Sequence, residues 1–406
     1  MAHRYESLLL ASCLLFGCRA SQRPAATVVR PGIDVLLADS AHLIAGRRVG
    51  IITNQTGIDR DGVSDVARLL DASVKLTAIF SPEHGFRGTL DKEGIGNSTD
   101  SATGLPIYSL YGEHRKPTPE MLNSIDVLLI DLQDIGARPF TYISTALLAM
   151  RSAADADMPV IVLDRPNPIG GEIVQGPVLG REFASFVGML PVALRHGMTV
   201  GELALLGNDE LTIGARLTVV PAAGWRRSEW FDDTGLPWVK PSPNMPDLES
   251  ATHYPGIVLF EGTNLSVGRG TPVAFQLVGA PWLDPAALIR RLNSEPGVEF
   301  SDTVVVPRVP GDGKYPDRPV RSVRLRVADR SRYDPIRLAL RMMVLLTESY
   351  PDSFRITNEA YFDARSGSDS LRLGLERGTS WEEIYRSWQD SREQFAKRRK
   401  PYLIYP

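Results

Sequence analysis

The sequence predicts an α/β protein in which a doubly wound, mostly parallel sheet is followed by a smaller α+β domain. Four short apolar runs have the unbroken hydrophobicity of strands that helices cover on both faces. These runs are residues 49–52, 76–80, 127–130 and 160–163. Segments with helical spacing lie between them, at 61–70 and 141–156, and this β-α-β order is typical of a doubly wound fold.

Five further elements complete the N-terminal part of the chain. They are a helix at 32–47, a short strand or turn at 108–111, a short helix at 118–123, a helix that begins at Thr199 and a strand at 217–221. Glu202 stands three residues after Thr199, so the two residues form a capping box. Residues 86–103 are rich in Gly, Asp, Ser and Thr and have no period, which suits a mobile loop over a site.

The second half of the chain alternates differently and predicts an α+β domain. Residues 225–246 contain three Trp and four Pro, and such a rigid, irregular segment suits a domain junction. We therefore expect one domain at 31–240 and a second at 241–406. Strands are expected at 257–260, 275–278, 304–309 and 323–327, and helices from Asp284-Pro285, over 335–348, and from Ser380 to about residue 398.

Length and charge limit the class of protein. A chain of 406 residues exceeds one ordinary hydrophobic core, which favours two domains. The formal net charge is -3, and basic residues form no stripe or tail. Nucleic acid is therefore not expected as a partner.

The first residues predict export. Residues 8–17 are an apolar run of signal-peptide length, too short to span a bilayer. The run ends in Leu15-Phe16-Gly17-Cys18, which resembles a bacterial lipobox, so we expect a leader at 1–17, a lipid on Cys18 and a tether at 18–30. Ordinary cleavage after Ala20 is the alternative. Either way the protein is expected in the periplasm or cell envelope, and a lipid on Cys18 would hold it on a membrane, the outer one in a double-membraned cell.

Polar residues follow each of the four long strands at the point where it ends. The clusters include Asn54, Glu83-His84, Asp131 with Gln133 and Asp134, and Asp164-Arg165 with Asn167. Ligands bind at this carboxyl edge in open α/β sheets, so these residues and the nearby Arg138 are candidates for a site. Alternation along an extended segment lets at most two of Asp131, Gln133 and Asp134 reach one ligand. Asp164 and Arg165 are as simply explained by an ion pair.

Glu83 is the sharpest local signal for acid catalysis. It follows an apolar strand, and Phe80 and Phe86 beside it would raise its carboxyl pKa by desolvation, as a general acid requires. His84 would orient Glu83 or a water. The structural alternative is that Glu83 caps a helix or pairs with an arginine.

The second half of the chain adds a further acidic cluster and an arginine. Glu261 opens the sequence Glu261-Gly262-Thr263-Asn264 after an apolar run, and Arg269 lies in the glycine-containing loop 266–271. A guanidinium can bind a carboxylate with two hydrogen bonds, so these arginines suit an anionic substrate.

Several kinds of site find no support in the sequence. It has no G-x-G-x-x-G after a strand, no P-loop and no G-x-S-x-G. His84, His114, His196 and His253 are scattered, and H-E-x-x-H is absent. We therefore expect neither a cofactor nor a metal.

Longer motifs in this chain resemble a known bacterial family. FSPEHGFRG, IDVLLIDLQDIGAR, VLDRPNPIGG, GLPWVKPSPNMP and YPGIVLFEGTNLSVGRGT are similar, in this order, to the family once called DUF1343 and now associated with NamZ-type exo-β-N-acetylmuramidases. The resemblance extends over about residues 32–405. It implies a Rossmann-like N-terminal domain, a smaller C-terminal domain and a cleft between them that removes terminal N-acetylmuramic acid from the non-reducing end of peptidoglycan fragments.

The resemblance and the strand-end clusters together define the candidate residues. The expected catalytic residues are Glu83, His84, Asp131 and Glu261. The expected substrate-binding residues are Asn54, Gln133, Asp134, Arg138, Arg165, Asn167, Asn244, Asn264 and Arg269. The second catalytic group stays open between Asp131 and Glu261, and Arg269 is the first candidate to bind the lactyl carboxylate of muramic acid.

The chain departs from the family pattern at two positions where glutamate is expected. Gln175 and Gln276 cannot exchange the catalytic proton, so the acid and base are sought among Glu83, Asp131, Asp134, Asp164 and Glu261. Two other classes of function are considered. A non-catalytic lipoprotein that binds cell-wall fragments would use the same arginines, whereas an esterase or deacetylase lacks a supporting nucleophile or metal motif.

Overall fold

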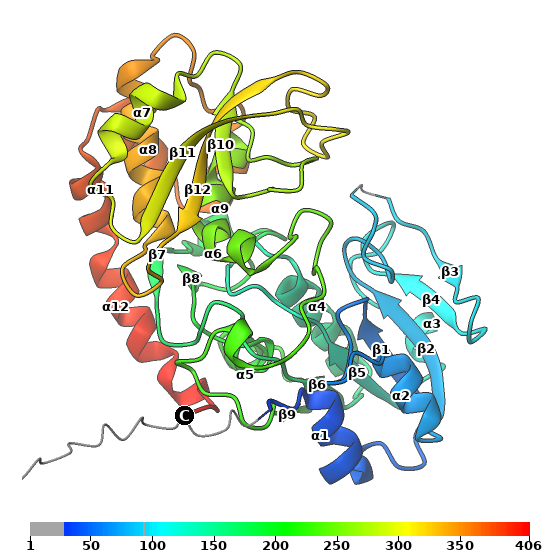
Figure 1. The fold of residues 1–406 in the computed structure, drawn as a ribbon. Coiled ribbons are helices and arrows are strands. Elements are labelled where there is room, and N and C mark those ends of the chain that lie inside the picture. Colours follow the sequence, from blue (N-terminus) through cyan, green and yellow to red (C-terminus); the bar gives the residue numbers. More distant parts are fainter. Residues whose placement is uncertain (1–27, 92–93) are drawn as a thin grey trace, which may run out of the picture.

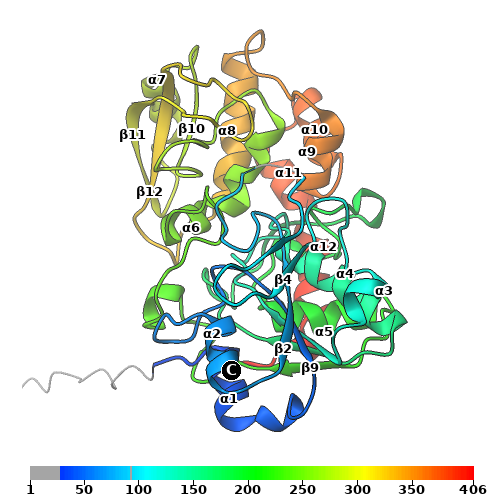
Figure 2. The same ribbon diagram turned by 90° about the vertical axis from the view of Figure 1, so that its right-hand side faces the viewer.

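The computed structural model describes residues 28–91 and 94–406 (Figure 1). The predicted leader, Cys18 and most of the tether lie outside the described residues. Two units follow each other along the chain, each built on its own sheet, and Figure 2 shows the two sheets one above the other. Among the described helices, none is long and apolar enough to cross a membrane.

The first unit is built on a seven-stranded sheet with the order β3-β4-β2-β1-β5-β6-β9. Its strands are β1 (Val49–Thr53), β2 (Leu76–Ser81), β3 (Ser98–Thr99), β4 (Pro106–Ser109), β5 (Val127–Asp131), β6 (Val160–Leu163) and β9 (Leu217–Val220). All neighbouring pairs are parallel except β3 with β4. The chain winds outward from β1 in both directions, so the predicted doubly wound sheet is confirmed.

Helices cover both faces of this sheet because successive strand residues point to opposite sides. Ile51 and Leu129 pack with α1 and α2, whereas Ile52 and Leu128 pack with α4 and α5. The helices of this unit are α1 (Gly32–Asp39), η1 (Ala41–Leu43), α2 (Asp65–Asp71), α3 (Pro119–Leu122), α4 (Tyr142–Asp155) and α5 (Val200–Glu210). The predicted capping box of Thr199 and Glu202 opens α5.

The second unit has a three-stranded antiparallel sheet with the order β10-β12-β11. Its strands are β10 (Leu277–Ala280), β11 (Val298–Val305) and β12 (Val320–Val327). Its helices are α6 (Leu248–Ile257), η4 (Val258–Gly262), α7 (Pro285–Leu292), α8 (Pro335–Ser349), α9 (Glu359–Ser366), α10 (Ser370–Glu376), α11 (Trp381–Ser387), α12 (Gln389–Arg398) and η5 (Lys400–Tyr402). The two-stranded ribbon of β7 (Gln175–Val178) and β8 (Ala193–Arg195), with η2 (Arg181–Phe183), lies between β6 and β9 in the sequence, and η3 (Phe231–Asp233) follows β9.

One predicted strand of the second unit is wrong. Residues 257–260 are helical, at the junction of α6 and η4, because a short apolar run fits a buried helix as well as a strand. Asp247 starts α6 by accepting a hydrogen bond from the Ser250 backbone N–H. Gly256 then lets α6 approach α8 closely, since a Cβ at this position would lie 1.9 Å from the Pro335 carbonyl oxygen.

Other boundaries in the second unit also differ from the sequence prediction. The strands expected at 275–278 and 304–309 lie at β10 and β11, and the final helix divides at Trp388 into α11 and α12. One buried cluster contains residues of both units, such as Leu128 of β5 and Leu340 of α8. The boundary near residue 240 therefore marks a change of sheet within a shared core, and the division into two domains stays a prediction.

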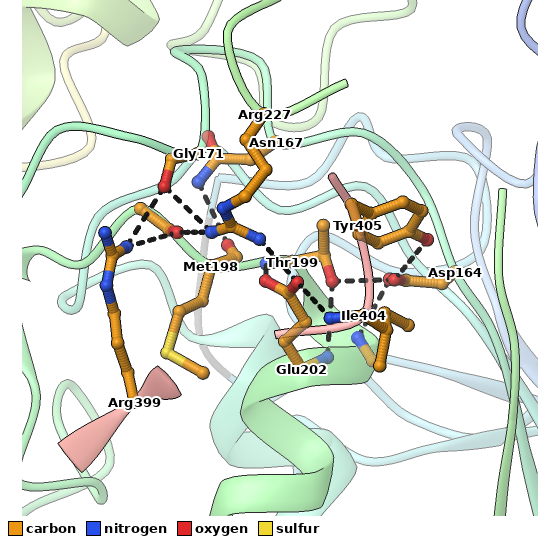
Figure 3. A network of polar contacts seen from close by, with 12 residues as sticks. Asp164, Asn167, Gly171, Met198, Thr199, Glu202, Arg227, Arg399, Ile404 and Tyr405 are labelled. Carbon is orange, nitrogen blue, oxygen red and sulfur yellow. Dashed lines mark hydrogen bonds and ion pairs between the residues drawn. The ribbon is translucent and has the colours of Figure 1, made fainter. Parts of the chain in front are cut away.

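The C-terminal residues return to the first unit. Figure 1 shows α12 running from the second unit towards the parallel sheet, and the final residues then enter the polar network of Figure 3. The Tyr405 hydroxyl donates to Asp164 Oδ2 at 2.6 Å and accepts from the Ala222 N–H at 2.9 Å. The Ile404 N–H donates to Glu202 Oε1 at 3.0 Å. The end of the chain thus holds the first unit to the second.

We call the contacts of Ile404 and Tyr405 with the first unit the C-terminal clasp. If they stabilise the fold, Tyr405→Phe should lower the stability of the protein measurably. The variant keeps the ring and removes a buried hydroxyl that serves Asp164 and Ala222, so the free energy of unfolding should fall by about 1–3 kcal/mol, read from thermal or denaturant unfolding. Tyr402→Phe is the matched control, because its hydroxyl donates to Asp209 in exposed surroundings. An equal change in both variants would contradict a stabilising role for the clasp.

Candidate active site

A cleft of about 510 Å³ opens between the two units. Loops after β2 and β4 form one wall, and α6, η4, the loop before β10 and α9 form the other. Four acidic and three basic residues line the cleft together with His84. The acidic residues are Glu83, Asp91, Glu261 and Asp312, and the basic residues are Arg115, Arg269 and Arg365. Both predicted glutamates therefore face one cavity, from opposite units.

Glu83 reaches the cleft through a tight turn at the end of β2. His84 and Gly85 both have positive φ angles, of 70° and 73°, and the Gly85 N–H donates to the Pro82 carbonyl at 3.1 Å. The Thr141 hydroxyl, at the start of α4, donates to Glu83 Oε2. The carboxyl group is half-buried and fixed in direction.

His84 contributes to the cleft differently from the prediction. Its Nδ1 donates to the Leu90 carbonyl oxygen at 2.7 Å, so the ring holds the loop that follows β2. The aromatic residues around the cleft also differ from those expected. Tyr111, Phe140, Phe186, Tyr254 and Phe275 line it, whereas Phe80 and Phe86 do not.

Glu261 sits in η4 and has two arginine partners. Arg269 Nε donates to Oε1 at 2.6 Å and Arg365 Nε donates to Oε2 at 3.2 Å. Burial alone raises the pKa of Glu261, but the two guanidinium groups outweigh it and hold the pKa below its ordinary value. Glu261 therefore stays ionised at neutral pH.

Lys314 holds the backbone around Glu261 in place. Its Nζ donates to the carbonyl oxygens of Phe260, Glu261 and Leu265 at 3.1, 3.0 and 2.9 Å. The first two carbonyls lie in the last turn of η4, where a helix leaves acceptors without partners, and the third lies in the loop that follows. The ammonium group thus fixes the backbone that carries Glu261.

Tyr254 of α6 interacts electrostatically with both glutamates. Burial raises the pKa of its hydroxyl, and the carboxylates of Glu261 and Glu83 raise it further. Its ring contacts Phe275 and Phe140, with centroid distances of 4.7 and 6.2 Å. The sequence reading missed Tyr254 because nothing in its local pattern distinguishes it from a core aromatic residue.

Arg115 is a second residue that the sequence reading missed. It follows Tyr111 by four residues, in the segment after β4, and lies over the rings of Tyr111 and Phe186 at 4.0 and 4.7 Å from their centroids. The spacing of Tyr and Arg downstream of a strand end is its only signal in the sequence.

The structure corrects the prediction for the acidic groups of the other strand ends. Asp131 is fully buried and accepts two hydrogen bonds from Arg165, at 2.5 and 3.0 Å. Burial raises the pKa of Asp134 to about 7 and that of Asp164 to about 6, against hydrogen bonds that lower both. None of the three lines the cleft, so Glu83 and Glu261 are the acidic candidates that remain.

Most of the predicted substrate-binding residues form hydrogen bonds with other groups of the protein. Arg138 donates to the carbonyl oxygens of Pro177, Val192 and Arg365, each at 2.9 Å. Other internal partners are Tyr142 for Asn54, Pro166 for Gln133, Met198 for Asn167 and Ser353 for Asn264. Asn244 donates to Asp91, a residue of the cleft, at 2.8 Å. Arg269 alone of the predicted set lines the cleft itself.

The two glutamines that depart from the family pattern lie outside the cleft. Gln276 is buried and donates to Asp247 and to the Ser250 hydroxyl, and Gln175 accepts from Arg195 at 3.0 Å. Both side chains thus have structural partners. Among the described residues, no group of three or more His, Cys, Asp or Glu is placed to hold a metal ion.

Comparisons with known proteins point to one family along nearly the whole chain. Residues 49–249 match the family model "Exo-beta-N-acetylmuramidase NamZ, N-terminal", and residues 252–405 match its C-terminal counterpart. The chain is 45% identical over 381 residues to the peptidoglycan beta-N-acetylmuramidase NamZ of Bacillus subtilis (strain 168), covering 93% of this chain and 91% of that protein.

Two crystal structures of DUF1343 family proteins from Bacteroides fragilis NCTC 9343 are similar to the fold. The first has a TM-score of 0.86 at 36% identity and covers 94% of this chain and 100% of that one. The second has a TM-score of 0.74 at 31% identity and covers 93% and 99%.

Proposed function

The chain belongs to the NamZ family of exo-β-N-acetylmuramidases, and we propose that the cleft between its two units is where terminal N-acetylmuramic acid is bound and released. The protein is an exo-acting glycoside hydrolase of peptidoglycan turnover that removes this sugar from the non-reducing end. The alternative, a binding protein without catalysis, is disfavoured because the chain is 45% identical to a peptidoglycan beta-N-acetylmuramidase.

The observation that carries the assignment of the site is the contrast between its two glutamates. Glu261 has two arginine partners, whereas Glu83 accepts from the neutral Thr141 hydroxyl and pairs with no cation among the described residues. Glycoside hydrolysis needs one group that gives a proton and another that is ionised. Glu83 suits the first role and Glu261 the second.

The proposed reaction follows from these roles. Glu83 gives its proton to the glycosidic oxygen as the bond to the anomeric carbon breaks, so the leaving sugar departs as a neutral alcohol. Glu261 faces the positive charge that develops at the sugar. It then takes a proton from the attacking water, stabilises the intermediate directly, or holds the acetamido group that does so, and all three roles require an ionised carboxylate.

The rest of the cleft supports the same proposal. The rings of Phe140, Tyr254 and Phe275 offer an apolar surface for one face of a sugar ring, and the hydroxyl of Tyr254 lies near both carboxylates. Thr141 fixes the position of Glu83, and Lys314 fixes that of Glu261.

The function and the role of Glu83 share one test. Wild-type protein should release muramic acid from a muramic acid–N-acetylglucosamine disaccharide and release nothing from its glucosamine-terminated counterpart. Glu83→Gln keeps the shape and loses the proton, so the rate on the disaccharide should fall by about 10²- to 10⁴-fold. On a nitrophenyl glycoside, whose leaving group needs little protonation, the loss should be smaller. Equal losses on both substrates would show that Glu83 is not the acid.

The role of Glu261 predicts a shift in the pH profile of Arg365→Gln. Without one of the two guanidinium groups, burial is less opposed and the pKa of Glu261 rises. The acid limb of kcat/KM should therefore move to higher pH, and activity should be lost earlier on acidification. Arg48→Gln, which removes an exposed ion pair with Asp126, is the control. An acid limb that stays in place in Arg365→Gln would exclude Glu261 as the ionised group.

We further propose that the protein is exported and held on a membrane by a lipid on Cys18. The support is the lipobox-like sequence Leu15-Phe16-Gly17-Cys18, and Arg19 after it favours the outer membrane in a double-membraned cell. Cys18→Ala should lose the membrane association that wild-type protein shows in detergent partitioning. Wild-type protein that is wholly soluble in the periplasm or medium would exclude the anchor.

A further inference from the structure

Three arginines line the cleft, and two of them already have carboxylate partners. Arg269 pairs with Glu261 at 2.6 Å and with Asp91 at 3.5 Å, and Arg365 pairs with Glu261 at 3.2 Å. These contacts serve to keep Glu261 ionised. A substrate carboxylate bound by either arginine would have to share it with Glu261.

Arg115 is placed differently. Among the described residues it makes no ion pair, and its Nη1 is buried without a hydrogen-bond partner. Its guanidinium group lies against the faces of Tyr111 and Phe186, whose ring centroids are 6.0 Å apart. Contact with two aromatic rings fixes the plane of the guanidinium, and Nη1 keeps a donor that no described group accepts.

Arg115 also lies beside the proposed acid. Burial raises the pKa of the Tyr111 hydroxyl, the neighbouring Glu83 raises it further, and Arg115 lowers it, so Tyr111 lies close to both side chains. The cation without a carboxylate partner is therefore at the Glu83 end of the cleft, where the sugar to be cleaved has to bind.

We propose that Arg115 binds the lactyl carboxylate of the terminal muramic acid and thereby sets the preference for muramic acid over N-acetylglucosamine. This inference rests on the proposed function, because it names the substrate contact made in the same cleft. Four acidic residues line that cleft and would repel the substrate's carboxylate. The carboxylate can therefore bind only next to a cation that has no carboxylate partner within the protein. The carboxylate would accept a charge-assisted hydrogen bond from the unpartnered Nη1 of Arg115.

Paired substrates test this contact directly. One is a nitrophenyl glycoside of N-acetylmuramic acid, and the other is the same glycoside with the lactyl carboxylate converted to the neutral amide. Arg115→Gln should lower kcat/KM on the acid by roughly ten- to hundred-fold and change it on the amide much less, because one charge-assisted contact is lost. Arg115→Lys keeps the charge but not the planar fork, so its loss on the acid should be intermediate.

Arg269→Gln is the matched comparison within the cleft. Since Arg269 acts through Glu261, this variant should lower kcat/KM on the acid and the amide by similar factors. Activity on the amide also reports that Arg115→Gln is folded. Equal losses on both substrates in Arg115→Gln, or a loss confined to the acid in Arg269→Gln, would overturn the assignment to Arg115.

A binding measurement separates this inference from the proposed function. Calorimetric titration with free N-acetylmuramic acid and with its lactyl amide needs no catalysis. Wild type should bind the acid more tightly, and Arg115→Gln should lose this difference. If wild type released no sugar yet showed this pattern, the proposed function would fail and the role of Arg115 would stand, whereas equal binding of the two compounds by wild type would overturn the role of Arg115.

Discussion

The requirement that buried charge be paired decides where the site lies in this fold. At the exits of β5 and β6 two carboxylates have partners within the protein: Asp131 with Arg165, and Asp164 with Thr199 and Tyr405. In an open α/β sheet the crevice beside these strands is the usual ligand site. Here the chain's own contacts fill it, and the open cleft lies at the exit of β2.

The same internal contacts hold the two units in register. Arg138 joins carbonyls of the β7–β8 region to Arg365 of α9, and the C-terminal residues join α12 to the parallel sheet. The walls of the cleft come from different units, so the distance between the two glutamates depends on these buried bonds. Residues far from the chemistry thereby maintain its geometry.

Within the cleft, pairing also separates the two carboxyl groups by role. Glu261 is surrounded by Arg269, Arg365 and the ammonium of Lys314, and remains charged in spite of its burial. Glu83 has a hydroxyl donor in place of a cation. Two carboxyl groups in one site that differ in this way are the usual basis for dividing acid and base functions.

The sequence was a good guide to the parallel sheet and a poor one to the use of its polar residues. Continuous apolar runs identified β1, β2, β5 and β6 because nothing else buries both faces of a strand. The strand predicted at residues 257–260 was wrong, because four apolar residues in a row show neither the period of a helix nor that of a strand.

The site shows the same limit for individual side chains. Glu83 and Glu261 were identified from strand ends and motifs, but Arg138 and Arg165 were assigned to substrate although they serve internal acceptors. Arg115 was missed because its environment is formed by Phe186, which is distant in sequence. Whether a polar residue faces a ligand or the protein depends on tertiary contacts that no local pattern records.

Glu83 and Glu261 are proposed to act on one sugar from opposite sides of this cleft. A crystal structure of the full chain with Glu83→Gln, soaked with the muramic acid–N-acetylglucosamine disaccharide, tests it most directly. We expect the glycosidic oxygen within hydrogen-bond reach of residue 83, the anomeric carbon facing Glu261 and a sugar face on Tyr254 and Phe275. A disaccharide bound instead beside Gln133 and Arg165, at the exits of β5 and β6, would contradict it.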